Sequence, residues 1–353
     1  MLTFILFILL FTIIIMIHEA GHLLAAKKFG VYCYEFSFGM GPLLFKKKFK
    51  ETQYSIRALP IGGYVAMAGE PDGDEAYPDV VVPEGRRLTD QVWWKRVIIM
   101  LAGIFNNILL AYLIFTFVVL GVGAVSTSPD PIVDSVVAGS PAAEAGLEPG
   151  DRILEIRKED GTSVKPKEFV DMQSFVTDGS ELTYTVQRGE EEVKVTMTPE
   201  YDKEQDRYLV GISGGAAKPV KVNLWNCWYY GAYEMVVITR MMFQAIVNIF
   251  QGAGLASLSG PVGIYQATDA YVKMGFSSYM LLIAQLSLNI GIFNALPLPV
   301  LDGGQVVITC AEAAFHKQLN SKIKTALMIA CWVLLIGLML FVTWNDISRL
   351  IFK

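Results

Sequence analysis

The sequence is poor in charged residues and in histidine for its length. Of its 353 residues, 18% are charged, 53% are hydrophobic and only three are histidines. A soluble protein of this size carries more charge, whereas a chain made of membrane spans alone would be shorter. We therefore expect membrane helices combined with a soluble domain.

Two further absences narrow the class of protein. The four cysteines, at positions 33, 227, 310 and 331, share no spacing typical of a disulfide framework or a metal site, so we interpret them as small apolar residues. No basic patch interleaved with aromatic residues is present, which argues against a nucleic-acid partner.

The first apolar run lacks the positively charged start of a secretory signal, because no lysine or arginine precedes Lys27. Cleavage would also remove or separate His18 and His22. We therefore expect this run to remain as a transmembrane helix, and three later runs are also long enough to span a bilayer. The predicted spans are about 2–25, 97–120, 279–301 and 325–343.

A fifth apolar stretch, 235–250, is shorter and carries Arg240 and Gln244 behind a cluster of aromatic residues. We predict that it lies at the membrane interface, within an amphipathic segment at 218–278. With four spans, the first and third run in the same direction, so their C-terminal ends lie at similar depth on one side. A fifth span would separate those ends.

The first predicted span contains the sequence His18-Glu19-Ala20-Gly21-His22. On a helix, His18 and His22 lie about one turn apart, so both rings can reach one Zn²⁺ ion. Glu19 lies beside them and is well placed to take a proton from an attacking water, as the H-E-x-x-H spacing implies. The motif predicts a zinc hydrolase.

The third ligand is expected to be a carboxylate. The remaining histidine, His316, lies outside every apolar run, whereas Asp302 closes the third one in Leu301-Asp302-Gly303. In the four-span topology Asp302 lies on the same side of the membrane as the histidines. Ionisable residues inside a membrane are functional by default.

Basic residues are unevenly divided between the connections. The 25–96 connection carries eleven lysines and arginines, several of them next to a span, whereas 126–218 holds 19 acidic against 10 basic residues. By the positive-inside rule the first connection is cytoplasmic and the second lies outside. The metal site is then expected near the cytoplasmic face.

Within the 30–96 region, residues 53–69 are typical of short β-forming pieces around Leu59-Pro60-Ile61-Gly62-Gly63. Their apolar character predicts a re-entrant hairpin that is buried against protein beside the site. Gly62 and Gly63 are candidates to hold an extended substrate. An ordinary cytoplasmic hairpin is the alternative.

Residues 126–217 differ from the rest, with many charged residues, frequent turns and alternating runs at 182–186 and 193–197. A compact soluble α+β domain fits this pattern. It is inserted between the two stretches of the membrane core, 1–125 and 279–353. Ser140 followed by Pro141 predicts a helix start and Gly146 its stop.

Three motifs together give the chain a family resemblance. They are His18 to His22, Asn294 to Gly304 and Ser140 to Asp151. The chain resembles the site-2 protease family of M50-type intramembrane zinc metalloproteases, in the bacterial regulator-of-sigma-E form with a single PDZ domain. The resemblance covers essentially the whole chain and implies a polytopic α-helical membrane protein with an inserted PDZ-like domain.

The resemblance also implies roles for residues and for partners. His18, His22 and Asp302 would be zinc ligands, Glu19 the base, and Asn294 a residue that holds unwound substrate. The substrates would be single-pass membrane proteins that another protease has already cut, such as anti-sigma factors or signal-peptide remnants. The location would be the inner membrane of a bacterium.

Pro297 and Pro299 lack N–H groups, so they would break the third helix near the metal and leave room for a peptide. Their alternative interpretation is a simple helix terminator. In the PDZ-like domain, Leu209, Val210, Gly211 and Ile212 look like the strand that binds a carboxylate or a peptide. The alternative there is a closed domain that filters substrates by size.

One rival function belongs to another class: a non-catalytic membrane receptor or adaptor with a structural metal site. Glu19 argues against it, because a structural zinc site has no use for an acid next to its ligands and prefers four protein ligands. A zinc transporter is a second rival, and it would need further ligands inside the spans.

Overall fold

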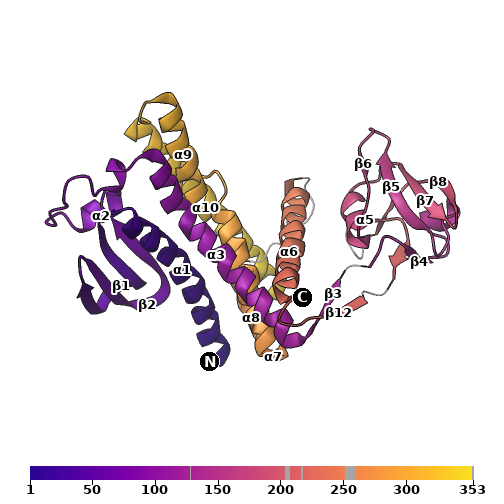
Figure 1. The fold of residues 1–353 in the computed structure, drawn as a ribbon, viewed down its shortest axis with the longest axis horizontal. Helices are drawn as coiled ribbons and strands as arrows, with labels where there is room; N and C mark the ends of the chain where they lie inside the picture. The colour runs from indigo at the N-terminus through magenta and orange to yellow at the C-terminus, as the bar shows by residue number, and fades with distance from the viewer. Residues whose placement is uncertain (128, 203–206, 216–217, 251–259, 352–353) are drawn as a thin grey trace. The chain divides into compact units, whose positions relative to one another are not determined.

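The computed structural model describes residues 1–127, 129–202, 207–215, 218–250 and 260–351 (Figure 1). The chain divides into two compact units. The membrane unit comprises Met1–Gly121 and Leu224–Lys353, and the inserted unit comprises Val122–Asn223.

In the part of the membrane unit that the structure describes, four helices are long and apolar enough to cross a bilayer. They are α1 (Leu2–Lys28), α3 (Trp93–Val122), α8 (Phe276–Asn294) and α10 (Ser321–Ile351). Small residues bring α1 and α3 close together, since a Cβ atom on Gly21 would lie 2.7 Å from the carbonyl carbon of Ala102. Apolar side chains of α1 and α3 also pack on α8, around Leu10 and Phe115 respectively.

Further helices complete the unit: α2 (Pro71–Ala76), α6 (Cys227–Phe250), α7 (Pro261–Met274) and α9 (Asp302–Phe315), with a 3₁₀ turn at Leu88–Asp90. Side chains of α6 such as Ile238 and Met242 pack against the cluster that α3 and α8 form. Helix α6 contains the 235–250 stretch expected at the interface, and it is not among the four candidate spans.

The third span is shorter than its apolar run suggests. Helix α8 ends at Asn294, whereas the expected span continues to 301. Residues 295–301 form a loop, because Pro297 and Pro299 cannot donate helical hydrogen bonds. Asp302 therefore does not close a helix: it is the first residue of α9.

Strands β1 (Cys33–Phe49) and β2 (Thr52–Met67) form a long antiparallel hairpin. Each strand contributes two segments to the resulting sheet. The first half of β1 pairs on one side with residues 63–67 and on the other with residues 53–56. The second half of β1 pairs only with the first half of β2, and it forms the outer edge of the sheet. At the opposite edge, the 63–67 segment runs beside α1, where Val65 contacts Glu19.

The inserted unit is an α+β domain with a four-stranded sheet in the order β6-β5-β7-β8. These strands are β5 (Arg152–Lys158), β6 (Ser163–Val164), β7 (Leu182–Arg188) and β8 (Glu191–Met197). The two-stranded pairs are β3 (Ala124–Thr127) with β12 (Lys218–Lys221), β4 (Val133–Val136) with β11 (Ile212–Gly214), and β9 (Glu200–Asp202) with β10 (Arg207–Leu209).

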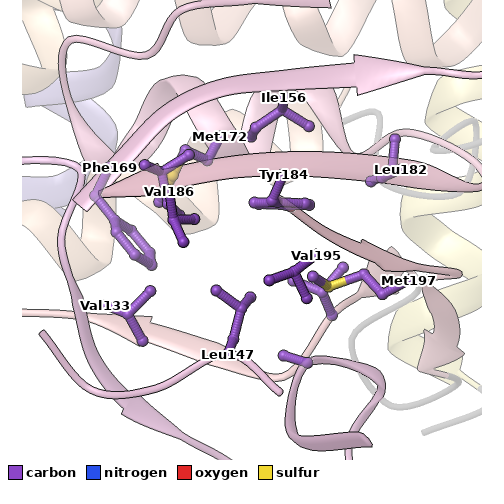
Figure 2. Packing of buried hydrophobic residues seen from close by; sticks show 13 residues of the cluster. Val133, Leu147, Ile156, Phe169, Met172, Leu182, Tyr184, Val186, Val195 and Met197 are labelled. Atoms are coloured by element: carbon purple, nitrogen blue, oxygen red, sulfur yellow. The ribbon is translucent and has the colours of Figure 1, made fainter. Parts of the chain in front are cut away.

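Figure 2 shows the core of this unit, in which Val133, Ile156 and Tyr184 are fully buried. Helices α4 (Pro141–Glu144) and α5 (Phe169–Phe175) contribute to it through Ala142 and Phe169. The hydroxyl of Ser140 accepts a hydrogen bond from the amide of Ala143 and so caps α4. The unit therefore has a hydrophobic core of its own.

Candidate metal centre

The two histidines of the motif lie on one face of α1 and are both buried. Four residues make slightly more than one helical turn, so the rings lie above one another. Their centroids are 4.8 Å apart and the two Nε2 atoms are 3.2 Å apart.

Asp302 joins the two histidines from the start of α9. Its Oδ2 atom lies 3.1 Å from Nε2 of His18 and 3.4 Å from Nε2 of His22. The glycines that follow explain how α9 can begin here. A Cβ atom on Gly303 would lie 2.7 Å from the carbonyl oxygen of Leu296, and one on Gly304 would lie 2.7 Å from the nitrogen of Pro299. Only glycine lets the start of α9 press against the 295–301 loop.

Helix α3 contacts both imidazole rings at their Nδ1 atoms. The Nδ1 atom of His22 lies 2.8 Å from the carbonyl oxygen of Ile99, and Nδ1 of His18 lies 3.3 Å from the side-chain amide of Asn107. Between these positions, a Cβ atom on Gly103 would lie 2.8 Å from Cε1 of His18 and closer still to Nε2 of His22. One face of α3 thus fixes the orientation of both rings.

The three converging atoms have the character of a cation site. A carbonyl oxygen only accepts hydrogen bonds, so Nδ1 of His22 is the protonated nitrogen and its Nε2 presents a lone pair. This lone pair faces Oδ2 of Asp302, which is buried and receives no hydrogen bond from the described residues. Converging lone pairs repel one another unless a cation lies between them.

The size of the triangle fits zinc. Ligands at about 2.0–2.1 Å in a tetrahedral arrangement are about 3.3–3.4 Å apart, and the three atoms are separated by 3.1–3.4 Å. Two imidazole nitrogens and a carboxylate oxygen are a donor set that zinc accepts, with one position left open. Among the described residues, these three form the group of His, Cys, Asp and Glu that could hold a metal ion.

Glu19 is directed toward the hairpin. Its Oε2 atom accepts a hydrogen bond of 3.1 Å from the backbone amide of Val65 in β2. The third histidine, His316, is exposed at the end of α9.

Comparison with known proteins connects this geometry to a reaction. Residues 6–338 match peptidase family M50. The chain belongs to peptidase family M50. The regulator of sigma-W protease RasP of Bacillus subtilis is 31% identical, and the zinc metalloprotease RasP of Bacillus licheniformis is 32% identical; each alignment covers 99% of both chains. This M50 peptidase is accordingly a site-2-type intramembrane metalloendopeptidase with four candidate membrane-spanning helices.

One solved structure resembles a quarter of the chain. The PDZ domain of an SdrC-like protein from Listeria monocytogenes is 28% identical, covering 25% of this peptidase and 90% of that chain, with a TM-score of 0.20.

The residues predicted to bind substrate fall into three places. Asn294 is the last residue of α8, and Pro297 and Pro299 lie in the loop that leads to Asp302. The loop is tied to α9, because the carbonyl oxygen of Pro299 accepts a hydrogen bond of 2.6 Å from the side chain of Gln305. Sequence reasoning finds no role for Gln305.

Gly62 and Gly63 lie in β2 against α1. Gly62 has a φ of 81°, and a Cβ atom there would lie 3.8 Å from Cδ1 of Ile15. A Cβ atom on Gly63 would lie 2.6 Å from the sulfur of Met16. Both glycines thus pack on the turn of α1 that precedes His18.

Leu209, Val210, Gly211 and Ile212 belong to the inserted unit. The carbonyl oxygen of Val210 accepts a hydrogen bond of 2.9 Å from the amide of Ala142, and that of Gly211 accepts one of 2.8 Å from Val137. Gly211 has a φ of 81° and packs against the side chain of Ser140. This segment is therefore tied to α4 and to the end of β4.

Asn107 and the carbonyl of Ile99 are site residues that the motifs do not single out. A backbone carbonyl has no signature in a sequence. Asn107 could have been found as a fully buried amide in an apolar span, since such a group needs a partner.

Proposed function

We propose that this peptidase uses zinc held by His18, His22 and Asp302, with Glu19 as the general base. The observation that carries the proposal is the convergence of three lone-pair atoms within 3.1–3.4 Å of one another. Zinc, when bound, would supply a Lewis acid that lowers the pKa of water and polarises a peptide carbonyl.

The chain's own residues would perform the remaining work. The carboxylate of Glu19 takes a proton from the water that attacks the peptide carbonyl, and then gives that proton to the departing amide nitrogen. The amide of Val65 holds the Glu19 carboxylate in one rotamer. Nδ1–H of His18 would need an acceptor. The Asn107 atom that lies 3.3 Å away is Nδ2, so a 180° turn of this amide would bring in Oδ1, which has no hydrogen-bond partner among the described residues.

The hairpin would be re-entrant and would lie beside the site. This proposal is supported by Thr12, in the middle of α1, whose hydroxyl donates a hydrogen bond of 2.8 Å to the carbonyl oxygen of Pro60. A contact at that depth requires backbone that is buried against protein or lines a cavity.

A helical substrate must be unwound locally before its peptide bonds can be reached. Gly62 and Gly63 on one side, and Asn294, Pro297 and Pro299 on the other, would hold it extended. The missing N–H groups of the prolines interrupt the helix at this point, which would leave room for a peptide beside the loop.

The substrates would be single-pass membrane proteins already cut by another protease, of the anti-sigma-factor or signal-peptide type. The name of the Bacillus subtilis relative, regulator of sigma-W protease, supports the first class. The inserted unit, as a PDZ-like domain, would filter them by size or recruit them through Leu209 to Ile212.

The pairing of β3 with β12 gives a clean test of that role. Thr127 and Lys218 are paired across the two strands, so replacing 128–217 by a two-residue Asn-Gly turn preserves the base of the insertion. A size filter predicts that the deletion variant cleaves substrates with intact outer domains. A recruiting domain predicts slower cleavage of short substrates. An unchanged ratio between long and short substrates would exclude both roles.

The protein would lie in the bacterial inner membrane with the metal site near the cytoplasmic face and the inserted unit outside. The excess of lysine and arginine in 25–96 supports this orientation. Cysteines introduced at 155–205 should react with an impermeant reagent added from outside, whereas those at 46–48 should not. The reverse labelling pattern would overturn the orientation.

The catalytic assignment is tested by separating metal content from activity. Glu19→Gln should abolish cleavage and retain about one zinc per chain, because Glu19 is not a ligand. His18→Ala and Asp302→Ala should lose both zinc and activity. Normal proteolysis by Glu19→Gln would exclude Glu19 as the general base.

A further inference from the structure

The outer edge strand of the hairpin, residues 40–50, combines exposed apolar residues with lysines. These residues have no role in the proposed reaction. All residues from Met40 to Phe49 are exposed, whereas the first half of β1 is largely buried. Leu44, Phe45 and Phe49 are 68%, 58% and 60% exposed. Lysines occupy positions 46, 47, 48 and 50.

The lysines of this edge differ from the other basic residues of the same region. Lys27 donates to the hydroxyl of Tyr54, Arg57 pairs with Glu35, and Arg86 pairs with Glu51. Lys46, Lys47 and Lys48 form no ion pair with a residue that the structure describes. Three adjacent cations therefore point outward with their charges uncompensated.

The depth of the strand follows from its contacts with α1. Tyr54 contacts Lys27 in the last turn of α1, and Pro60 contacts Thr12. The helix rises about 22 Å between Thr12 and Lys27, and β2 advances about 20 Å between Tyr54 and Pro60. Strand and helix thus run side by side along the same axis.

This register assigns a level to each residue of the outer strand. Lys47 is paired with Tyr54, which shares a rung of the sheet with Phe36 and Val65. Because Val65 contacts Glu19 and Tyr54 contacts Lys27, this rung lies along the last turns of α1, next to its basic end. Phe45 is paired with Ile56, which places it about 7 Å deeper. Ile56 is itself 47% exposed and extends the apolar surface around Phe45.

We propose that the segment Leu43–Lys50 is a binding site for anionic phospholipids at the membrane interface, in which Lys46, Lys47 and Lys48 bind headgroup phosphates and the side chains of Leu44 and Phe45 reach the acyl chains, while the open backbone edge stays in the hydrated headgroup region. The inference rests on the re-entrant placement of the hairpin proposed above and names its lipid partner. Clustered lysines next to a span attract acidic lipids by about 1 kcal/mol each, which is about fivefold per lysine.

An acidic protein segment is the competing occupant, and the depth argues against it. Such a partner would pair with the lysines but would leave the apolar residues at a level where lipid is the surrounding solvent. A phospholipid can contact the lysines through its headgroup phosphate and the apolar residues through its acyl chains at the same time. Because β1 and β2 form one sheet, this contact also anchors the strand that carries Val65 and hence the carboxylate of Glu19.

The test measures which lipid surrounds the strand in the full-length protein. A bimane probe is attached to Phe45→Cys in a Cys310→Ala background, since the other cysteines are buried. The protein is reconstituted in a two-to-one mixture of phosphatidylcholine and phosphatidylglycerol, with one or the other lipid brominated on its acyl chains. A probe at Leu340→Cys, on the exposed apolar face of α10, serves as the reference.

Brominated phosphatidylglycerol should quench the Phe45 probe at least about twofold more per molecule than brominated phosphatidylcholine. The two lipids should quench the Leu340 probe equally. The preference should vanish in the triple variant Lys46→Gln, Lys47→Gln, Lys48→Gln, and in about 1 M salt, where charges are screened within about 3 Å. The control Lys165→Gln, Lys167→Gln, Lys194→Gln removes the same charge from exposed sites of the inserted unit and should retain it.

Three results would overturn the proposal in distinguishable ways. Equal quenching by both lipids would leave the hairpin in the membrane and remove only its lipid preference. Quenching of the Phe45 probe by neither lipid, with the Leu340 probe still quenched, would mean that this edge of the hairpin does not contact lipid, and its placement in the membrane would fail as well. A preference that persists in the triple variant would also remove the lysines from the site.

Discussion

The two units of this peptidase both bury apolar residues, but they differ in what they expose and in which polar residues they bury. In the inserted unit the core is apolar, as Val133, Ile156 and Tyr184 illustrate, and charged side chains lie mainly outside. In the membrane unit, exposed side chains on α10 such as Leu334 and Leu340 are apolar, while His18 and Asn107 are buried. Solvent explains the contrast, because lipid does not drive apolar side chains inward.

The contrast changes what a buried polar residue means. In the membrane unit, water cannot hydrate a buried imidazole or amide. Such a group therefore needs a hydrogen-bond partner or a ligand, and it usually has a function. In the inserted unit, a buried carboxylate such as Asp151 pairs with Arg188 and accepts a hydrogen bond from the amide of Glu148, so we expect its role to be structural. The predictions below probe both sides of this comparison.

The largest effect should come from filling the space between α3 and the imidazoles. Gly103→Ala places a methyl group where Nε2 of His22 and Cε1 of His18 now lie, so at least one ring must move. We expect zinc affinity and cleavage to fall by about 100-fold or more, because ligand geometry is lost. Zinc content by atomic emission and a cleavage assay measure the two effects.

A matched control lies on the same helix. Gly121→Ala adds the same methyl group to α3 at a position with open space, so it should leave zinc and activity unchanged. Full zinc occupancy and normal cleavage in Gly103→Ala would contradict the role that we assign to this face of α3.

An intermediate effect is expected from the neighbouring asparagines. Asn107→Ala removes the amide that contacts Nδ1 of His18, and we expect a roughly 10- to 100-fold loss of zinc affinity, measured by competition with a chelator. Asn106 donates a hydrogen bond of 3.1 Å to the backbone of Ile17, so Asn106→Ala should lower thermal stability more than zinc affinity. Equal zinc affinity in the two variants would make Asn107 merely structural.

Sequence reasoning reached the metal centre through spacing. The interval between His18 and His22 fixes their relation on any helix, and Asp302 is one of few ionisable residues near the end of an apolar run. Apart from Asn107, a polar residue within an apolar run, the contribution of α3 could not be predicted, because Gly103 looks like any small residue in a span and Ile99 acts through its carbonyl. The ligand and base roles themselves stay predictions.

The fold, like the metal centre, could be predicted only in part. Four apolar runs predicted four long helices, and such helices are present. The third span was expected to reach 301 because hydrophobicity continues that far, but the helix stops at Asn294, ahead of Pro297 and Pro299, which were predicted to break it. The double pairing of β1 was not predictable, since it depends on a bend in each strand rather than on alternation of side chains.

The smallest effect concerns the buried carboxylate of the inserted unit. Asp151 is fully buried and accepts hydrogen bonds of 2.8 and 2.7 Å from Arg188 and one of 3.0 Å from the amide of Glu148. The bonds from Arg188 lower the pKa of Asp151, against the opposing effect of burial. Asp151→Asn should destabilise the unit by about 1–3 kcal/mol at neutral pH.

The destabilisation caused by Asp151→Asn should depend on pH. A carboxyl group with a lowered folded-state pKa stabilises the fold above its unfolded pKa, and this contribution is lost as the pH falls through the folded value, below 3.8. Hydrogen exchange of β5 and β7 in the full-length protein should therefore differ between Asp151→Asn and wild type at about pH 7 and converge toward about pH 3. Zinc content at neutral pH should be the same in both, because this carboxylate serves only its own fold; a loss of zinc would show that burial of a charge has functional meaning in both units.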